Sequence, residues 1–379
     1  MKITDIVTFH CSDGRRNTIF LQMHTDEGLV GVGEPYTIGP DEGVLALVES
    51  IKPWFVGQDP SRIEWLLRRA RNTMRFPLGP VAWSALSGID HCLWDIAGKA
   101  AGVPTYMLLG GKSRDRVRVY RGVGGTTPED LAESAIALKE EGYSAFKTSP
   151  YPQGWREMPW NLVVRESAAR LEALRAAVGE DADIAIDIHT TLVEAARARQ
   201  LADAVTPYRL MFVEEAVRPE NIATMARVRA QVRVPLATGE NLFGLSQFTD
   251  LIESEAVDII QPDLCVCGGL LEAKKIAAVA EANYVTIAPH NPLGLLSTAV
   301  SVHLAACTPN FIILEYQGDH TQPKARFVDD AWQPIDGYFA IPTRPGLGME
   351  LDIDAIQCHP PIQWDRGFPT LADGSPANL

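Results

Sequence analysis

The chain contains 379 residues, of which 46% are hydrophobic and 22% are charged. This length is too great for a domain with one hydrophobic core of ordinary size. It suits either two domains or one large α/β barrel with additional segments. The formal net charge of −14 argues against a nucleic-acid partner, because binding to nucleic acid requires a basic face. An anionic substrate stays open, since a bound cation reverses the local sign of a site.

The six cysteines are scattered along the chain, so we expect free thiols and no disulfide framework. Cys265 and Cys267 lie near a predicted strand end, and we interpret them as small packing residues. No apolar run approaches the ~20 residues of a membrane span. The segment Met1–Val7 reads as a strand rather than a targeting signal, so we expect a soluble, cytoplasmic protein with no membrane partner.

An antiparallel meander followed by helices is predicted at the start of the chain. The turn signal Asp13-Gly14 separates its first two strands, and Asp26-Glu27-Gly28 precedes the third. The expected strands cover residues 2–11, 17–25 and 30–34, and the expected helices cover residues 41–52, 60–73 and 80–101. Strands first and helices second indicate an α+β domain over residues 1–115.

After Lys112 the predicted strands and helices alternate strictly. Thr127 is a suitable N-cap, and Pro128 a suitable first residue, for the first helix of this series. The expected strands are 117–120, 145–149, 183–189, 209–214, 235–239, 257–262, 284–289 and 311–315. The later helices are expected over 161–178, 192–205, 220–232, 244–255, 271–283 and 296–306. This alternation predicts parallel βαβ units that close into a (β/α)8 barrel.

The predicted fold class is therefore α/β, with a (β/α)8 barrel, similar to a TIM barrel, over residues 116–325. The α+β segment 1–115 is expected to be a separate domain. Residues 326–379 contain the turn signals Asp336-Gly337 and Pro345–Gly348. We expect this C-terminal segment to pack back on the first domain.

Three carboxylates stand at the ends of consecutive predicted barrel strands. Asp187, Glu214 and Glu240 are separated by 27 and 26 residues, about one strand-plus-helix unit. Parallel barrel strands deliver their C-terminal residues to one face, so these oxygen ligands should meet there. Mg²⁺ suits such a site, because it is usually held by a few carboxylates together with water and substrate oxygens. The alternative is that each acid caps the helix that follows its strand.

Further polar groups end the other barrel strands, namely Lys147, Ser149, His189, Asp263, His290 and Glu315. Asp187 and His189 are two residues apart, so the strand period points both into the barrel mouth. Asp263 and His290 end neighbouring strands, where the carboxylate could orient the imidazole and raise its basicity. The alternative for each residue is a purely structural role. In that case His189 makes its hydrogen bonds within the fold, and His290 packs under the turn that follows it. Asp263 then holds its loop, and Glu315 forms an ion pair at the barrel floor.

At these residues the chain resembles the enolase superfamily, in its mandelate racemase branch, over nearly its whole length. The matching motifs are Val213-Glu214-Glu215, Gly239-Glu240-Asn241, Pro262-Asp263, Ala288–Pro292 and Glu315, with Ala85–Asp90, Leu93–Ile96 and Leu108–Gly111 nearer the N-terminus. The resemblance implies that Asp187, Glu214 and Glu240 bind Mg²⁺ and that Asp263 and His290 form a catalytic dyad. It implies further that the barrel is a modified (β/α)8 barrel and that residues 1–115 form a capping domain, the cap, which the C-terminal segment 326–379 completes. It also implies a homo-oligomer, the common state of family members.

One departure from the family pattern narrows the expected activity. Racemases of this branch carry a second lysine two residues past the position of Lys147, and this chain has Ser149 there. A two-base racemisation therefore lacks one base. Instead, the pattern Asp187-Ile188-His189 is similar to that of the galactonate and mannonate dehydratases of the family. For Lys147 three roles stay open: proton transfer, stabilisation of substrate charge, and pairing with Asp187 to tune the metal.

The expected reaction is the Mg²⁺-dependent dehydration of a sugar acid, an aldonate such as galactonate, gluconate or mannonate, to a 2-keto-3-deoxy acid. Members of this superfamily use a Lys or His base with Mg²⁺. Here His290 would remove the proton next to the carboxylate, Lys147 and a protonated Glu315 would stabilise the enediolate, and His189 would protonate the departing hydroxyl. The alternatives are an epimerase, racemase or lactone cycloisomerase on the same site, and a non-catalytic sugar-acid-binding homologue.

The resemblance also implies that substrate is selected at two segments near the barrel mouth. These are the cap loop 34–40 and the insertion 150–157 after the second barrel strand. The candidates for substrate contact are Tyr36, Tyr151, Trp155, Arg156 and Asn241. An arginine suits a distal carboxylate or an array of hydroxyl groups. The alternative is that these side chains only pack the loops or an oligomer interface.

Overall fold

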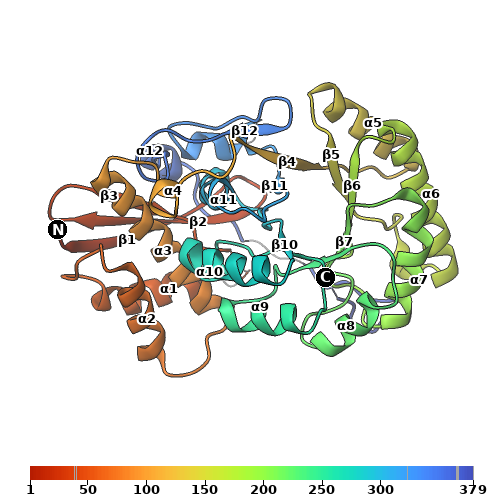
Figure 1. Cartoon of the computed structure of the whole chain (residues 1–379), viewed down its shortest axis with the longest axis horizontal. Coiled ribbons are helices and arrows are strands. Elements are labelled where there is room, and N and C mark those ends of the chain that lie inside the picture. The colour runs from red at the N-terminus through yellow and green to blue at the C-terminus, as the bar shows by residue number, and fades with distance from the viewer. Residues whose placement is uncertain (38, 40, 322, 364–366, 379) are drawn as a thin grey trace.

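The computed structural model describes residues 1–37, 39, 41–321, 323–363 and 367–378 (Figure 1). Ile38 and Pro40, which belong to the predicted cap loop, lie outside the described residues. Within the described ranges, no helix is both long enough and apolar enough to cross a bilayer.

The N-terminal segment forms an antiparallel sheet covered by helices, as its strand-then-helix pattern predicts. The sheet order is β1 (Ile3–Ser12), β2 (Asn17–Thr25) and β3 (Val30–Gly33), followed along the chain by α1 (Asp41–Ile51), α2 (Ile63–Met74) and α3 (Pro80–Ala101). Helix α3 packs so closely on β3 that a Cβ at Gly33 would lie 2.1 Å from the Gly88 carbonyl oxygen. Glycine is therefore required where this sheet meets α3.

Parallel strands close into a barrel in the rest of the described chain. They are β4 (Arg116–Gly122), β5 (Ala145–Thr148), β6 (Asp183–Asp187), β7 (Phe212–Glu214), β8 (Leu236–Thr238), β9 (Ile259–Ile260), β10 (Thr286–Ile287) and β11 (Leu314–Tyr316). Each of β4 to β9 pairs in parallel with the next strand, and β11 pairs with β4. The Ile312 amide donates to the Ile287 carbonyl oxygen at 3.0 Å, which joins the two ends of the sheet. This arrangement confirms the predicted fold class.

Helices surround the barrel in the predicted order. They are α5 (Pro128–Glu140), α6 (Trp160–Val178), α7 (Ala195–Val205), α8 (Ile222–Arg229), α9 (Gly244–Glu253), α10 (Gly269–Ala282) and α11 (Leu295–Ala306), with the short α4 (Thr105–Leu108) before β4. Helix α5 begins with a capping box, in which Thr127 and Asp130 each accept a hydrogen bond from the other's backbone amide. Apart from β4, the barrel strands are shorter than predicted, because tilted barrel strands pair only where neighbours overlap.

The barrel interior explains why ionisable residues gather at its mouth. One cluster of buried side chains, contributed by all eight strand segments, consists of Tyr120, Ala145, Ala185, Phe212, Ala237, Ile259, Ala288 and Ile313. Strand side chains alternate between faces, so residues two positions further along point the same way. Those positions hold Lys147, Asp187, Glu214, His290 and Glu315. The apolar layer therefore forms a floor, and the ionisable layer lies above it.

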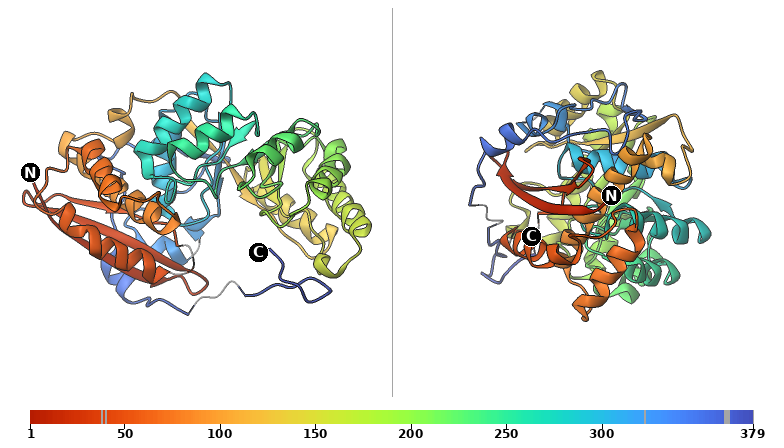
Figure 2. Two further views of the ribbon diagram at one scale, coloured as in Figure 1. Left: turned by 90° about the horizontal axis from the view of Figure 1, so that it is seen from below. Right: turned by 90° about the vertical axis from the view of Figure 1, so that its left-hand side faces the viewer.

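The C-terminal segment runs along the outside of the molecule, from the cap toward the half of the barrel that carries α6 and α7 (Figure 2). β12 (Tyr338–Ala340) pairs with β4, and α12 (Ile353–Gln357) lies against β1. Further on, Asn378 Nδ2 donates to the Thr190 carbonyl oxygen at 3.3 Å. We expected this segment to pack on the cap, and its contacts with β4 and Thr190 were not predicted. A turn-rich segment carries no periodic pattern that indicates its partner.

Candidate functional site

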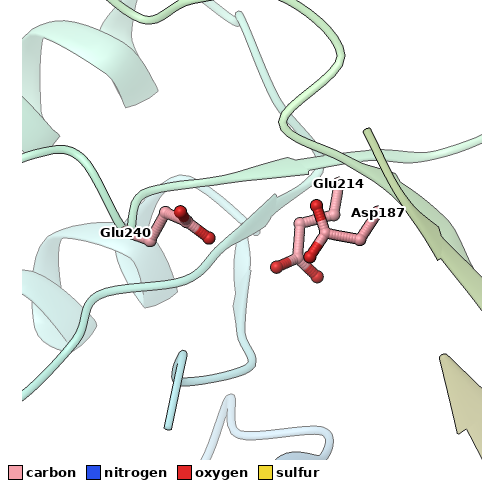
Figure 3. A group of neighbouring side chains, drawn as sticks. All are labelled: Asp187, Glu214 and Glu240. Atoms are coloured by element: carbon pink, nitrogen blue, oxygen red, sulfur yellow. The ribbon is translucent and has the colours of Figure 1, made fainter. Parts of the chain in front are cut away.

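Three carboxylates from adjacent strands converge at the barrel mouth (Figure 3). Asp187 ends β6, Glu214 ends β7 opposite Asp187 in the parallel register, and Glu240 follows β8. One oxygen from each side chain lies within 4.8 Å of the others. Gly239 precedes Glu240 with a φ of +147°, and a Cβ there would lie 2.9 Å from the Gln261 backbone. Glycine is therefore required at the turn that places Glu240 beside the other two acids.

This carboxylate trio (Asp187, Glu214 and Glu240) fits a hard divalent cation. Glu214 Oε2 and Glu240 Oε2 are buried and have no hydrogen-bond partner among the described residues. Burial, together with the neighbouring charge of Asp187, raises the pKa of both glutamates above the ordinary value. Carboxylates this close and this buried repel one another, and a cation between them would offset that repulsion. An all-oxygen donor set of this kind suits Mg²⁺.

Lys147 contacts three carboxylates at once. Its ammonium lies 2.8 Å from Glu214, 3.1 Å from Asp187 and 3.1 Å from Glu315. Burial opposes the charge on Lys147, but Glu214 and Glu315 outweigh burial and hold the pKa of the ammonium well above its usual value. Lys147 thus pairs with Asp187 and with two glutamates, while its role among the three that the sequence left open stays a prediction.

His290 and Asp263 are brought together as the sequence predicts. His290 Nδ1 lies 2.9 Å from Asp263 Oδ2, and the Cys265 amide donates to Asp263 Oδ1 at 2.7 Å. An ionised carboxylate only accepts hydrogen bonds, so Nδ1 carries the proton and His290 Nε2 faces Glu240, 3.4 Å away. Burial lowers the pKa of His290, but Glu240 and Asp263 outweigh burial and raise it well above the usual value.

Glu315 is an ion-pair partner at the barrel mouth. Besides Lys147, its carboxylate accepts hydrogen bonds from the Asn291 amide at 3.0 Å and from Gln317 Nε2 at 2.8 Å. Burial raises the pKa of Glu315, but Lys147 and His290 outweigh burial and hold the pKa below its usual value. These contacts favour the carboxylate form, whereas the sequence led us to expect a protonated Glu315.

His189 lies beside the trio as predicted, but a turn after β6 places it there and not the alternation of strand side chains. Strand β6 ends at Asp187, and His189 and Thr190 both have a φ of +54°, so the strand period does not extend to His189. Asp187 Oδ1 accepts a hydrogen bond from the His189 amide at 2.8 Å, a local bond that turns the backbone. The imidazole Nε2 still lies 3.2 Å from Asp187 Oδ2, and the side chain is 58% exposed.

The expected substrate contacts divide into separate groups. Tyr36 stacks on His290 with ring centroids 6.3 Å apart, so the cap loop reaches the dyad. Tyr151 and Trp155 stack on each other at 4.1 Å, and Arg156 lies over Trp155 and donates to the Asn378 carbonyl oxygen at 3.1 Å.

The fifth candidate, Asn241, is exposed at one wall of a cavity of about 480 Å³ that Thr190 and Phe243 also line. Asn241 Nδ2 donates to Glu215 Oε2 at 3.1 Å, so this amide is held by a carboxylate for which the sequence indicated no role. Glu215 is buried and also accepts hydrogen bonds from Thr238 and from the Gly239 amide. It therefore braces the turn that carries Glu240. Its one sequence signal was its position directly after Glu214.

Glu34 is a fully buried carboxylate where the cap meets α11. Its Oε2 accepts a hydrogen bond from the Ser297 amide at 2.8 Å. Burial is the main cause that raises the pKa of Glu34 from 4.5 to about 8, although the Ser297 bond and the charge of Lys324 act in the opposite direction. Between those two pH values the folded state binds the proton more tightly than the unfolded state does, so stability should fall as pH rises through this window.

We therefore expect Glu34→Gln, which mimics the protonated form, to become more stable relative to the wild type as pH rises from about 5 to about 8. The difference should reach ~2–4 kcal/mol and level off above the folded-state pKa. Urea denaturation at a series of pH values measures it. Glu64→Gln is the control, because Lys275 lowers the pKa of Glu64 and both states are ionised throughout this range. A pH-independent difference for Glu34→Gln would contradict the prediction.

Comparison with known proteins identifies the family. Residues 5–110 match the mandelate racemase / muconate lactonizing enzyme N-terminal domain, and residues 130–355 match the enolase C-terminal domain-like model. A D-galactonate dehydratase from Ralstonia pickettii (strain 12J) is 38% identical, over 93% of this chain and 92% of that protein. A D-galactonate dehydratase from Ralstonia nicotianae is also 38% identical, over 100% of both chains.

Solved structures show the same relationship. An enolase from Agrobacterium radiobacter, provisionally assigned as a galactarate dehydratase and bound to Na and L-malate, is 40% identical with a TM-score of 0.95 over 100% of both chains. A provisionally assigned dehydratase from Salmonella typhimurium is 32% identical with a TM-score of 0.90, over 94% of this chain and 98% of that chain. The present chain thus belongs to the mandelate racemase / muconate lactonizing enzyme family of the enolase superfamily.

Proposed function

We propose that this chain dehydrates a sugar acid to a 2-keto-3-deoxy acid with the help of Mg²⁺. The observation that carries the proposal is a pair of histidines that contact different members of the carboxylate trio. His290 Nε2 lies 3.4 Å from Glu240, and His189 Nε2 lies 3.2 Å from Asp187. Dehydration needs one group to remove a proton and another to deliver one, and histidine is suited to both tasks. Similarity to D-galactonate dehydratases supports the same reaction class.

Asp187, Glu214 and Glu240 would hold Mg²⁺, which supplies concentrated positive charge beside the substrate carboxylate when bound. Glu240 is the main cause that raises the pKa of His290, so a cation held by Glu240 would favour the neutral imidazole. In this neutral form His290, held by Asp263, removes the proton from the carbon next to that carboxylate. Lys147 places a further positive charge next to the trio. His189 protonates the hydroxyl group on the adjacent carbon, which leaves as water, and the resulting enol tautomerises to the 2-keto acid.

The rival reactions on this site are epimerisation and lactone cycloisomerisation. A second base would have to face the substrate opposite His290, and Lys147 would be the candidate. Its ammonium contacts Asp187, Glu214 and Glu315, which favours the protonated form and counts against that role. We extend the proposal to an aldonate such as galactonate as the small-molecule substrate, and to a cytoplasmic homo-oligomer whose assembly sedimentation equilibrium would test.

The test is a panel of aldonic and aldaric acids, incubated with Mg²⁺ or with a chelator and assayed for 2-keto acid. We expect at least one aldonate to give product with Mg²⁺ and none to give product after chelation. Exchange of the substrate α-proton with D2O, without formation of a 2-keto acid, would favour the rival reactions. Mg²⁺-dependent binding without exchange or product would instead indicate a non-catalytic sugar-acid-binding protein.

Replacing His189 should separate the two proton transfers. We expect His189→Gln to lower the rate of dehydration by about 10²-fold or more, because the hydroxyl group loses its acid. Exchange of the α-proton with solvent deuterium should persist, since His290 and the trio are unchanged. Proton NMR of the recovered substrate measures exchange, and His24→Gln in β2 is the control. Loss of exchange together with dehydration would show that the role of His189 is not confined to the second step.

A further inference from the structure

Helix α3 of the cap is hydrogen-bonded to the loop that follows β9, directly after Asp263. The bonds come from Ser87, Asp90 and His91, whose spacing places them on one side of the helix. Ser87 Oγ accepts from the Gly268 amide at 3.0 Å, and Asp90 Oδ1 accepts from the Leu270 amide at 2.5 Å. His91 Nε2 donates to the Leu264 carbonyl oxygen at 2.9 Å. The cap therefore holds this loop at Leu264 and Gly268, and it holds the first turn of α10 at Leu270.

His91 has a defined tautomer in this position. A carbonyl oxygen only accepts, so the bond to Leu264 places the proton on Nε2. Nδ1 is then an acceptor, and the Glu34 amide points to it at 3.4 Å. Burial lowers the pKa of His91 to about 4, so the ring is neutral at neutral pH. One imidazole thus joins the end of β3 to the first residue after Asp263.

The held loop in turn fixes the carboxylate of the dyad. The Cys265 amide donates to Asp263 Oδ1 at 2.7 Å, and the Cys265 carbonyl oxygen accepts from the Tyr36 amide at 3.0 Å. The other oxygen of Asp263 lies 2.9 Å from His290 Nδ1. A continuous path therefore leads from His91 through the Leu264–Cys265 backbone to Asp263 and His290.

A second series of hydrogen bonds leads from Glu34 of the cap to Glu315. Glu34 accepts from the Ser297 amide, and Ser297 Oγ donates to Asn291 Oδ1 at 2.7 Å. The Asn291 amide then donates to Glu315. Cys265 Sγ donates to Ser297 Oγ at 3.2 Å and links the two paths. Each of these side chains is buried, so bulk water cannot replace a lost hydrogen bond, and an unpaired polar group there lowers the stability of the fold.

We propose that His91 is a positioning residue for the Asp263–His290 dyad, acting through its hydrogen bond to the Leu264 carbonyl oxygen. This inference rests on the proposed function, in which His290 removes the substrate proton. A shift of the Leu264 carbonyl would move the Cys265 amide, release one oxygen of Asp263 and let the imidazole rotate away from the reacting carbon. Misplacement of a catalytic group by about 1 Å can cost about 10²-fold in rate.

The test compares variants of His91 with a matched histidine. His91→Leu removes the bond to Leu264, whereas His91→Gln keeps an N–H donor near the position of Nε2. His91→Asn covers the case in which the leucine variant does not fold, because its amide still accepts from Glu34 but is too short to reach Leu264. The control is His303→Leu in α11. His303 is fully buried, burial lowers its pKa to about 4, and it accepts from the Tyr106 amide at 3.1 Å.

We expect His91→Leu and His91→Asn to lower kcat by about 10- to 100-fold, with KM and the Mg²⁺ dissociation constant changed by less than about threefold. His91→Gln should recover most of the lost kcat. His303→Leu should lower the melting temperature about as much as His91→Leu does, without this fall in kcat. An unchanged kcat in His91→Leu or His91→Asn, or an equal fall in His303→Leu, would overturn the proposal.

A spectroscopic measurement decides the same question without turnover. The Nδ1 proton of His290 should give a downfield NMR signal, assigned by its loss in His290→Asn. We expect this signal to persist in His91→Gln and His303→Leu and to move or broaden in His91→Leu or His91→Asn. If the wild type dehydrates no sugar acid but the signal responds in this way, the proposed function fails and the positioning role stands. A signal unaffected by His91→Leu or His91→Asn would refute the positioning role whatever the activity.

Discussion

His290→Asn is expected to lower kcat for dehydration by ~10²–10⁴-fold, the usual contribution of a positioned acid or base. Asparagine keeps a polar group near Nδ1 that can contact Asp263, so the buried carboxylate retains a partner. It removes Nε2, the atom that faces Glu240 at 3.4 Å. The loss should therefore appear in kcat, while KM changes little. Steady-state kinetics with a turned-over aldonate measures both values.

Two further measurements distinguish this effect from general damage. Thermal unfolding of His290→Asn should stay close to that of the wild type, and Mg²⁺ affinity by calorimetry should change by less than about tenfold, because the trio is intact. His303→Asn removes another buried histidine, which lies in α11, and should leave kcat nearly unchanged. Wild-type turnover in His290→Asn would exclude His290 as the base.

Glu214→Gln should have opposite effects on stability without and with Mg²⁺. Without the metal, the variant relieves the repulsion of Glu214 with Asp187 and Glu240, while Lys147 keeps Asp187 and Glu315 as partners. Its melting temperature should therefore equal or exceed that of the wild type. With Mg²⁺, the wild type gains stability from ligand binding, by ~2.7 kcal/mol at 100 times the dissociation constant. The variant should lose most of this gain, together with dehydration activity. Differential scanning calorimetry with a Mg²⁺ titration measures both effects.

The control for Glu214→Gln is a buried carboxylate outside the trio. Asp95 in α3 is fully buried, pairs with Lys99 at 2.8 Å and accepts from the Leu347 amide. Asp95→Asn should lower the melting temperature with and without Mg²⁺ and leave the Mg²⁺-dependent increase intact. A Glu214→Gln variant that still shows the full Mg²⁺-dependent increase would contradict the assignment of Glu214 as a ligand.

The positions of most helices and strands followed from local pattern. The helix predicted over 80–101 is α3 (Pro80–Ala101), and the capping signal at Thr127 and Pro128 marks the start of α5. These features are predictable because hydrophobic periodicity and capping depend on residues within a few positions of one another. Strand ends were less accurate, since a barrel strand ends where its pairing with tilted neighbours ends.

The clustering of the trio and of the His290–Asp263 pair was also predictable from the sequence. The C-terminal ends of parallel barrel strands lie on one face, so a list of strand-end residues becomes a list of neighbours. The turn at His189 was not predictable in this way, because a local hydrogen bond to Asp187 ended the strand period two residues early. The charge state favoured for Glu315 also depended on how many cations surround it in space.

The sequence by itself thus determined the barrel, the cap and the identity of the acids and histidines at the barrel mouth. Only the tertiary structure decided that Lys147 contacts three carboxylates and that Asn378 reaches Thr190. It also decided that His91 holds Leu264, 173 residues away. The physical reason is that helix α3 is buried on nearly every side, so its pattern predicts a helix but not which residue faces the barrel loop.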